Sequence, residues 1–438
     1  MSKHPTQKIL DYAKKHGATS ADALHIESSS TELSVLNGVM DEAEQSVSSG
    51  IGLRVIVNGC QAVAHTSNLD DTGLNRLAEE TVAMAKAMPK AKFAYVNENW
   101  TKNIPDLQLE GDVTSIEELK EYALKTEAAG RDHKDILKSD GASASYGHSI
   151  ITLSTSTGFH HSYNKGSTSF GCTMLAGTEQ AKERDFKYTS ARYKEDLKAP
   201  DYIGQEAVRK AHARVGSTTM NLGQVPVIFH RDIAGRLIAE MLGAINGDSI
   251  VRGVSFLKDK RGEQIFPKNI TIMDDPHMLR GFGSRPVDAE GTETKAMHLI
   301  ENGVLRTWVT DLRTAHVLGE KSTGHAARGL SSLPSPSTSN VYMNAGAVTV
   351  DGLMSDIKKG FYVTGLKGRG GEIATGDYSV GAHGFLIENG IITKPLHNIT
   401  LAGNVLDMFK TVVAADDLEF TSSLTCPTLR VEGLTVAG

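Results

Sequence analysis

The chain has 438 residues, of which 39% are hydrophobic and 22% are charged, and its formal net charge is −6. This length exceeds the size at which a single hydrophobic core keeps growing, so two or three domains are expected, and the composition excludes a disordered chain. The negative charge and the lack of clustered Lys and Arg argue against direct binding of nucleic acid.

The first residues, MSKHPTQKILDYAKKHG, contain no apolar run of the kind found in a secretory signal. No later window approaches the roughly 18 apolar residues that a membrane span requires. The cysteines Cys60, Cys172 and Cys426 are odd in number and far apart, which suits free thiols in a reducing compartment. We therefore expect a cytoplasmic protein that does not bind membranes.

Residues 1–105 are predicted to form an α+β unit in the order helix, strands, helix. A helix is expected over residues 6–16, strands over 31–68 and a second helix over 71–88, each from the spacing of its apolar residues. The Asn-Gly pairs within the strand region, such as Asn37-Gly38, favour type I′ hairpin turns.

Residues 106–220 are predicted to repeat this order as a second α+β unit. Ser115 and Glu118 form a capping-box pattern at the start of a helix. Strands are expected within 136–158 and 167–178, and a closing helix follows. We interpret the two units as a structural duplication.

From about residue 222 the composition changes to short strands, hairpins and many glycines. Residues 221–438 are therefore predicted to form a β-rich domain of barrel or sandwich type, which makes the fold class α+β. Two hairpins share a Glu-Asn-Gly turn, at 301–303 and 388–390. A few helices are expected, at 231–246, about 311–319, about 350–359 and 404–414.

Ordered blocks of the C-terminal half resemble the TldD/PmbA family, and within it the PmbA (TldE) branch. The blocks are GDSIVRGVSFLKDKRGEQIF, ITIMDDPHMLRGFGSRPVDAEGTET, LIENGVLRTWVTDLRTAHVLGEKSTGHAARG, TGDYSVGAHGFLIENG and ITLAGNVLDMFKTVV. Nearer the N-terminus, GIGLRVIVNGCQAVAHTS fits the first domain of the family. The resemblance implies a multidomain chain of a cytoplasmic peptidase that is built from two related subunits and acts on peptides or unfolded proteins.

In the TldD branch, a helix with a His-Glu-x-x-x-His motif and a later Cys together hold zinc. When the GD…RG block that follows the motif is matched to the same block of this chain, the motif falls on Ile238, Ala239 and Gly243. None of these side chains can bind zinc or act as a base, so the resemblance implies a degenerate site without metal or cofactor. Cys426 lies in an ending that looks like that of PmbA, and we expect a buried, inert thiol. Zinc is expected in a TldD-type partner, and a homodimer of this chain is a further expectation.

Two polar segments beside glycines are the candidates for a surface that faces the peptide or the partner. They are Ser322, Thr323, Gly324 and His325, and Gly376, Asp377, Tyr378 and Ser379. Tight structural turns are the alternative explanation for each residue. Exposed apolar anchors are sought at Trp308, Tyr342 and Phe385, for which core packing is the alternative.

Histidines outside these segments give weaker signals. His230 lies ten residues before Glu240, so the two do not share a helical turn and a capping or surface histidine is expected. His160 and His161 are neighbours on a strand, where their side chains point to opposite faces and do not easily bind one ion.

Three loops contain residue types that are also found at other kinds of functional site. The carboxylates of DDPH (274–277) and DAEG (288–291) suit a cation site or ordinary turns. GLKGRGGEIATGD (365–377) has the glycines of a phosphate loop but lacks its Lys-Ser/Thr pair. KSTGHA (321–326) contains Ser, Thr and His, and a hydrolase would need a buried acid to orient the imidazole. The alternatives to a peptidase subunit are thus a non-enzymatic modulator, of DNA gyrase or of a toxin–antitoxin pair, and an independent hydrolase.

Overall fold

The structure is a computed structural model that describes residues 3–438. Its N-terminal half contains four α-helices, one 3₁₀ turn and six strands within these residues. They are α1 (Pro5–His16), β1 (Ser20–Leu36), β2 (Val39–Val57), β3 (Cys60–Thr66), α2 (Asp71–Ala87), α3 (Ile116–Arg131), β4 (Lys138–Thr155), β5 (His160–Gly177), β6 (Lys182–Ala191), η1 (Lys194–Asp196) and α4 (Pro200–Ala213).

The local signals of the sequence are confirmed in this half. The Ser115 side chain accepts the Glu118 N–H and the Glu118 carboxylate accepts the Ser115 N–H, which is the predicted capping box. Asn37 and Gly38 both have positive φ, +55° and +79°, as a type I′ turn requires. These signals are confirmed because each depends only on residues that are close in sequence.

One antiparallel sheet joins the two helix–strands–helix units. Its strand order is β3-β2-β1-β4-β5-β6, and β1 pairs with β2 on one side and with β4 on the other. The sequence does not predict this junction, because the pairing of Ala23 with Ser154 brings together residues from different units. It also misses β6, a strand at the edge of the sheet that begins with four charged residues, 182–185.

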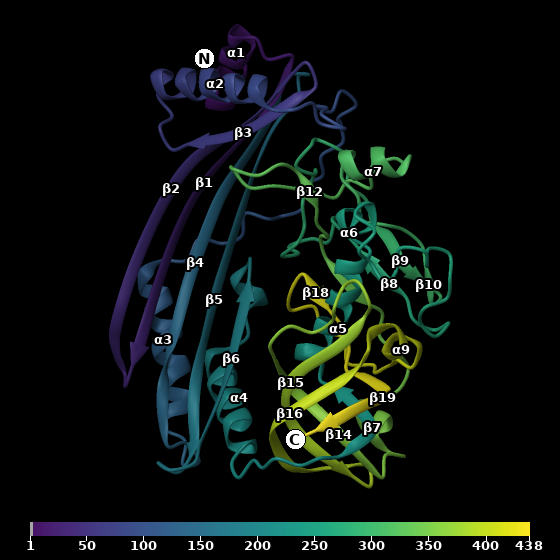
Figure 1. The fold of residues 1–438 in the computed structure, drawn as a ribbon. Coiled ribbons are helices and arrows are strands. Elements are labelled where there is room, and N and C mark those ends of the chain that lie inside the picture. The colour runs from purple at the N-terminus through teal and green to yellow at the C-terminus, as the bar shows by residue number, and fades with distance from the viewer. Residues whose placement is uncertain (1–2) are drawn as a thin grey trace.

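The helices cover one face of the long sheet, in pairs at its two ends (Figure 1). Ala21 and Ala23 of β1 pack in the core formed with α1 and α2, whereas Leu33 and Val35 pack with α3 and α4. These four positions are odd-numbered and share a face, and Leu24, on the opposite face, packs against Val287 of the C-terminal half. The helices therefore pack on the face opposite to the one that contacts Val287, and α4, at the β6 edge, also reaches the C-terminal half through the ion pair of Lys210 with Asp232 at 2.9 Å.

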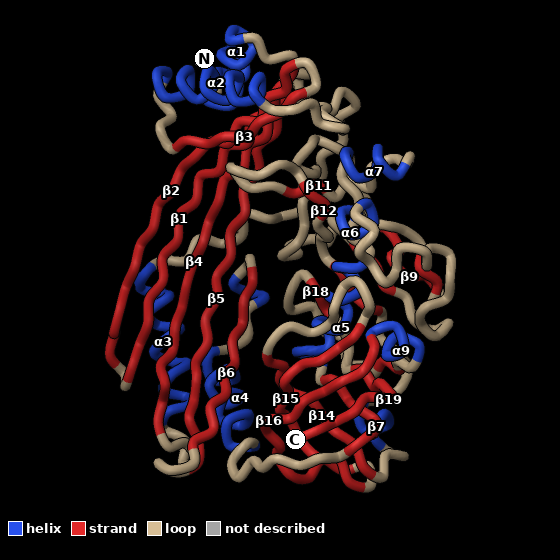
Figure 2. Tube along the Cα trace, viewed as in Figure 1, coloured by secondary structure: helices blue, strands red, loops and turns tan. Residues whose placement is uncertain are grey.

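The C-terminal half contains short helices and many strands (Figure 2). They are β7 (Gly223–Phe229), α5 (Arg231–Ala244), α6 (Gly247–Val251), β8 (Ile272–Asp274), β9 (Met297–Glu301), β10 (Val304–Leu305), α7 (Leu312–Leu318), β11 (Ala326–Ala327), β12 (Ser335–Pro336), β13 (Val341–Met343), α8 (Val350–Met354), β14 (Lys359–Lys367), β15 (Asp377–Glu388), β16 (Ile391–Asn404), α9 (Val405–Lys410), β17 (Val413–Ala414), β18 (Leu424–Thr425) and β19 (Leu429–Ala437).

The predicted barrel is confirmed. A sheet in the order β16-β15-β14-β7-β19-β17 closes because β16 also pairs with β19, so five strands form the barrel. Both Glu-Asn-Gly turns have positive φ at Asn and Gly, for example +51° at Asn302 and +79° at Gly303. A second sheet, in the order β10-β9-β8-β13-β18, lies beside the barrel.

Trp308 corrects one expectation about the surface. It is 4% exposed and belongs to the main C-terminal core, so it is not an exposed anchor. Tyr342 and Phe385 are half-buried. Large exposed apolar side chains lie elsewhere, including Val47 of β2 and Phe186 of β6. In residues 3–438, no helix is long and apolar enough to cross a membrane.

Candidate functional site

Helix α5 occupies the position that the resemblance assigns to a zinc-binding helix. His230 is its N-cap and accepts the Asp232 N–H at 3.1 Å, which is one of its two expected roles. The Arg236 guanidinium donates to the carbonyls of Leu366 and Gly368, at 3.2 and 2.7 Å. These bonds tie α5 to the glycine-rich loop that follows β14.

The three positions of the zinc motif differ in their surroundings. Ile238 is fully buried in the main core, Ala239 is exposed and Gly243 is half-buried. Ala239 and Gly243 are four residues apart and share a face of α5, whereas Ile238 points to the core. A Cβ atom at Gly243 would lie 3.6 Å from Ile373, an ordinary contact, so the helix has room for a side chain there.

Glu240 and the glycine-rich loop form a close contact beside these positions. A Cβ at Gly370 would lie 2.1 Å from Oε1 of Glu240, and a Cβ at Gly371 would lie 3.0 Å from its Oε2. Burial and the neighbouring Glu240 carboxylate raise the pKa of Tyr378. Gly370 and Gly371 therefore allow the close approach of this loop to α5.

The candidate segment 376–379 follows this loop. Gly376 has φ +77° and donates to the Glu372 carbonyl at 2.7 Å, while Thr375 Oγ1 donates to the Asp377 carboxylate at 2.9 Å. Gly376 and Tyr378 are buried, whereas Asp377 and Ser379 are exposed. The segment is a tight turn that presents two polar side chains at the start of β15.

Cys426 lies directly after β18, which packs against α5. Its side chain is 1% exposed and belongs to the same core as Ile238. Burial raises the pKa of the Cys426 thiol to about 12. A thiol protonated at neutral pH is a poor metal ligand and nucleophile.

The second candidate segment, 322–325, lies at another place in the C-terminal half. His325 is 2% exposed; its Nε2 is 3.0 Å from Oδ2 of Asp274 and its Nδ1 is 2.9 Å from Oγ1 of Thr323. The same hydroxyl accepts the N–H of Thr310 at 2.8 Å. Burial alone would raise the pKa of Asp274, but hydrogen bonds from His325 and Ser339 hold it below its ordinary value.

The DDPH and DAEG carboxylates are bonded within the protein. Oδ1 of Asp288 accepts the N–H groups of Glu290 and Thr292, at 2.9 and 2.8 Å. Oε2 of Glu290 accepts the Leu312 N–H at 2.9 Å, and its Oε1 is 3.9 Å from the guanidinium of Arg54. Asp288 therefore fixes its own loop, and Glu290 connects that loop to the long sheet.

A polar cavity of about 400 Å³ lies between the long sheet and the loop that contains Phe282. Ser28, Ser48 and Ser149 line it from three neighbouring strands, and Ser28 Oγ is 2.9 Å from Ser149 Oγ. Burial, followed by nearby arginines, lowers the pKa of Lys165 in its wall to about 8. This cavity is not predicted from the sequence, because its serines lie on different strands and become neighbours only through strand pairing.

Arg192 connects the walls of this cavity. Its guanidinium donates to the carbonyls of Leu109, Gly166 and Gly281, each at 3.0 Å. Leu109 and Gly166 belong to the N-terminal half and Gly281 to the C-terminal half. Arg192 therefore fixes the loop of Phe282 to the sheet.

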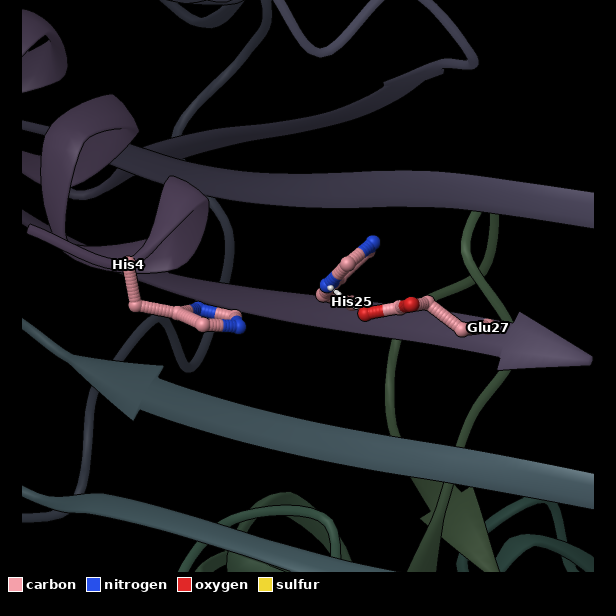
Figure 3. A group of neighbouring side chains, drawn as sticks. All are labelled: His4, His25 and Glu27. Atoms are coloured by element: carbon pink, nitrogen blue, oxygen red, sulfur yellow. Dashed lines mark ion pairs between the residues drawn. The ribbon is translucent and has the colours of Figure 1, made fainter.

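Within residues 3–438, one group of three potential metal ligands has its ligand atoms close together, and it does not include α5. It consists of His4, His25 and Glu27 at the N-terminal end of the long sheet (Figure 3). His160, on β5, lies close to His4, with 5.7 Å between the ring centroids. His161 stacks on Tyr163 instead, so the structure does not bring His160 and His161 to one site.

Comparisons with known proteins give matches along nearly the full length of the chain. Models of the PmbA/TldA metallopeptidase domain 1, central domain and C-terminal domain match residues 21–85, 110–215 and 222–438. A Haemophilus influenzae protein named metalloprotease PmbA homolog is 32% identical over 435 residues, covering 98% of this chain and 94% of that protein. Metalloprotease PmbA of Escherichia coli O157:H7 is 30% identical over 406 residues, covering 92% of this chain and 88% of that protein.

Solved structures share the fold. A Bacteroides thetaiotaomicron protein described as a candidate modulator of DNA gyrase has a TM-score of 0.90 and 27% identity, covering 99% of this chain and 98% of its own. TldE from Thermococcus kodakarensis has a TM-score of 0.87 and 22% identity, covering 99% of this chain and 100% of its own, a likeness of fold. With all three domain models matched in order and a 32% identical relative along nearly its entire length, the chain belongs to the PmbA/TldD metallopeptidase family.

Proposed function

We propose that this chain is a PmbA/TldE-like subunit of a cytoplasmic TldD–PmbA peptidase and that it leaves the catalytic zinc to its TldD-type partner. The observation that carries the proposal is the composition of α5. A core isoleucine, an exposed alanine and a glycine stand at the motif positions, and the thiol of Cys426 is sealed in the same core as Ile238. Zinc catalysis needs two or three converging ligands and a base for the bound water.

The substrate class is peptides or unfolded proteins. The serine-lined cavity offers hydroxyl groups that can donate to carbonyls and accept from N–H groups of an extended backbone. Such contacts recognise the main chain rather than particular side chains. This supports a role in shaping a peptide path.

Contact with the partner is proposed at Asp377 and Ser379. Both side chains are exposed on the turn beside α5, next to the region where a catalytic helix lies in the zinc-binding branch. A homodimer of this chain would use the equivalent surface in the absence of the partner, because related subunits tend to join through equivalent patches.

Co-expression with a TldD-type chain tests the proposal. Size-exclusion light scattering should show a heteromer, and its cleavage of an unfolded, fluorescently labelled polypeptide should exceed that of either chain alone. Asp377→Lys combined with Ser379→Arg should weaken assembly, whereas Glu79→Lys on exposed α2 is the matched control. If the TldD-type chain is fully active alone and this chain changes neither its mass nor its rate, the proposal is wrong. An effect on gyrase supercoiling in that event would favour the non-enzymatic modulator.

Zinc content provides an independent test of α5. Cys426→Ser should leave the zinc content of the dialysed chain unchanged. A loss of bound zinc in this variant would place a metal site at α5 and contradict the proposal.

The hydrogen-bonded series Thr323–His325–Asp274 is the one feature that favours an independent hydrolase. The order matches hydroxyl, imidazole and acid, but the imidazole is 2% exposed and the hydroxyl is bonded to Thr310. Thr323→Ala should therefore leave any measured peptide cleavage unchanged. A loss of cleavage in this variant, with its fold intact, would favour the independent hydrolase.

A further inference from the structure

Two imidazoles and a carboxylate converge at the N-terminal end of the long sheet. His25 and Glu27 are two residues apart on β1 and project from the same face, and His4 precedes α1 on that face. One potential ligand atom of each residue lies within 4.8 Å of the other two. Figure 3 shows the His4 ring directed toward His25 and Glu27, whose ion-pair contact is 3.5 Å between Nδ1 and Oε1.

Hydroxyl groups hold one nitrogen of each ring. His25 Nε2 is 3.0 Å from Ser49 Oγ, which leaves Nδ1 on the side of Glu27. His4 Nδ1 is 2.8 Å from Thr6 Oγ1 and, more distantly, 3.3 Å from the Thr6 N–H. In one tautomer Nδ1 accepts the Thr6 N–H as the N-cap of α1; in the other it donates to the Thr6 hydroxyl, and the lone pair available to a metal is then on Nε2. Metal-binding histidines in proteins are oriented in this way through their second nitrogen.

The hydroxyl contacts extend to a third ring. Thr6 Oγ1 is 2.7 Å from Ser154 Oγ, which is 2.8 Å from Nδ1 of His160. The four side chains thus form a hydrogen-bonded series that ends at an imidazole on each side. This series belongs neither to the main C-terminal core nor to α5.

Burial differs across the group in a way that suits an open metal site. The His25 side chain is 4% exposed, while that of Glu27 is 47% exposed. The exposed carboxylate leaves a path for an ion and for water.

We propose that His4, His25 and Glu27 bind a divalent transition-metal ion of the zinc type, with a coordination position left open beside His160. Two imidazoles and one carboxylate form a ligand set that zinc accepts with an additional water. Ligands of a tetrahedral zinc ion, at 2.0–2.2 Å from it, are about 3.4 Å apart. His25 and Glu27 already meet this spacing, and because all three ligand atoms lie within 4.8 Å of one another, the remaining distances must close by about 1.4 Å or less. The site is separate from α5 and does not depend on the proposed function.

Titration of the full chain with zinc tests this site. The chain, freed of metal by a chelator and dialysed, should bind one Zn²⁺ by calorimetry, and Co²⁺ should give the visible absorption of a four-coordinate ion with nitrogen and oxygen ligands. Glu27→Gln keeps the shape of the side chain, and His4→Asn keeps an N-cap acceptor for α1. Each should weaken zinc binding by roughly 10- to 100-fold or more, since even loss of an orienting partner has an effect of that size.

His133→Asn, in the loop after α3, is the matched control and should bind zinc as the unchanged chain does. Circular dichroism should be the same for all variants, so a weakened site is not a misfolded chain. The inference is overturned if the unchanged chain binds neither ion at micromolar concentration, or if Glu27→Gln and His4→Asn bind as tightly as the control.

The two proposals fail separately. Loss of zinc binding in Glu27→Gln, with heteromer formation and peptidase rate unchanged, supports the N-terminal site and leaves the peptidase role intact. Zinc that persists in both ligand variants but disappears in Cys426→Ser overturns the N-terminal site and the degenerate α5 together.

Discussion

Glu290 is the residue whose protonation bears most directly on stability. It is 4% exposed where the C-terminal half meets the long sheet. Burial, and then the neighbouring Asp288 carboxylate, raise the pKa of Glu290 to about 8. Burial likewise raises the pKa of Asp288 to about 6. Folding therefore increases the affinity of both carboxyl groups for a proton.

Glu290→Gln should flatten the pH dependence of stability. The folded state holds a proton that the unfolded chain releases above pH 4.5, so the stabilisation is complete below pH 4.5 and is lost as the pH rises to about 8. The unchanged chain should lose on the order of 1–3 kcal/mol across this window, and the variant markedly less. Urea unfolding between pH 5 and 8 measures the free energy of unfolding of each protein. Glu293→Gln, at an exposed position, is the control. Equal slopes for the unchanged chain and Glu290→Gln would refute this.

Removal of the His325 imidazole should destabilise the C-terminal half. Asp274 is fully buried and would lose the imidazole partner of its Oδ2, keeping on that oxygen the hydrogen bond from the Ser339 N–H at 3.0 Å. His325→Leu should cost about 3 kcal/mol, as expected when one partner of a buried pair is removed. Ser322→Ala, which removes a 3.3 Å hydrogen bond to Thr310, should cost less than about 1 kcal/mol in the same urea experiment. Similar costs would mean that His325 is not the dominant partner.

At the scale of elements, α5 should tolerate only part of a zinc motif. Ile238→His places a polar ring in a fully buried position and should cost about 2–4 kcal/mol. Ala239→Glu is on the exposed face and should cost less than about 0.5 kcal/mol.

The triple variant Ile238→His, Ala239→Glu, Gly243→His should then show no appreciable peptide cleavage, because the buried Cys426 thiol, with its pKa raised to about 12, is a poor third ligand. Thermal unfolding and a peptidase assay on the purified variants check both statements. Turnover by the triple variant would mean that the rest of a catalytic site is present.

At the scale of the whole molecule, the two halves approach closely at Gly52. A Cβ there would lie 2.1 Å from the backbone oxygen of Leu330, so the sheet and the C-terminal loop meet backbone to backbone. Gly52→Ala should push the halves apart, lower the unfolding temperature by several degrees and increase protease cleavage near residue 330.

Gly147→Ala is the matched control, because Gly147 is also a strand glycine and a Cβ there meets nothing within 4 Å. Small-angle scattering would report the change in the arrangement of the halves. Identical unfolding and cleavage for the two variants would show that the contact at Gly52 is not needed to hold them together.

The amino-acid sequence by itself determined the local elements and the family. The capping box at Ser115, the Asn-Gly turns and the apolar stripe of α5 depend on residues a few positions apart, so their energetics are local. The barrel class followed from hairpins and glycines, and the family from ordered blocks. For His230 the spacing left a capping or a surface role open, and the structure has it as the N-cap of α5.

Only the tertiary structure decided which distant residues meet. The single sheet depends on pairing β1 with β4, more than 100 residues apart, and this pairing creates both the serine-lined cavity and the approach of His160 to His4. The burial of Trp308, His325 and Glu290 is likewise set by elements packed from elsewhere in the chain. Contacts between residues far apart in the sequence depend on how whole helix and sheet faces pack together. Burial and desolvation act across the assembled structure rather than along a short stretch of sequence.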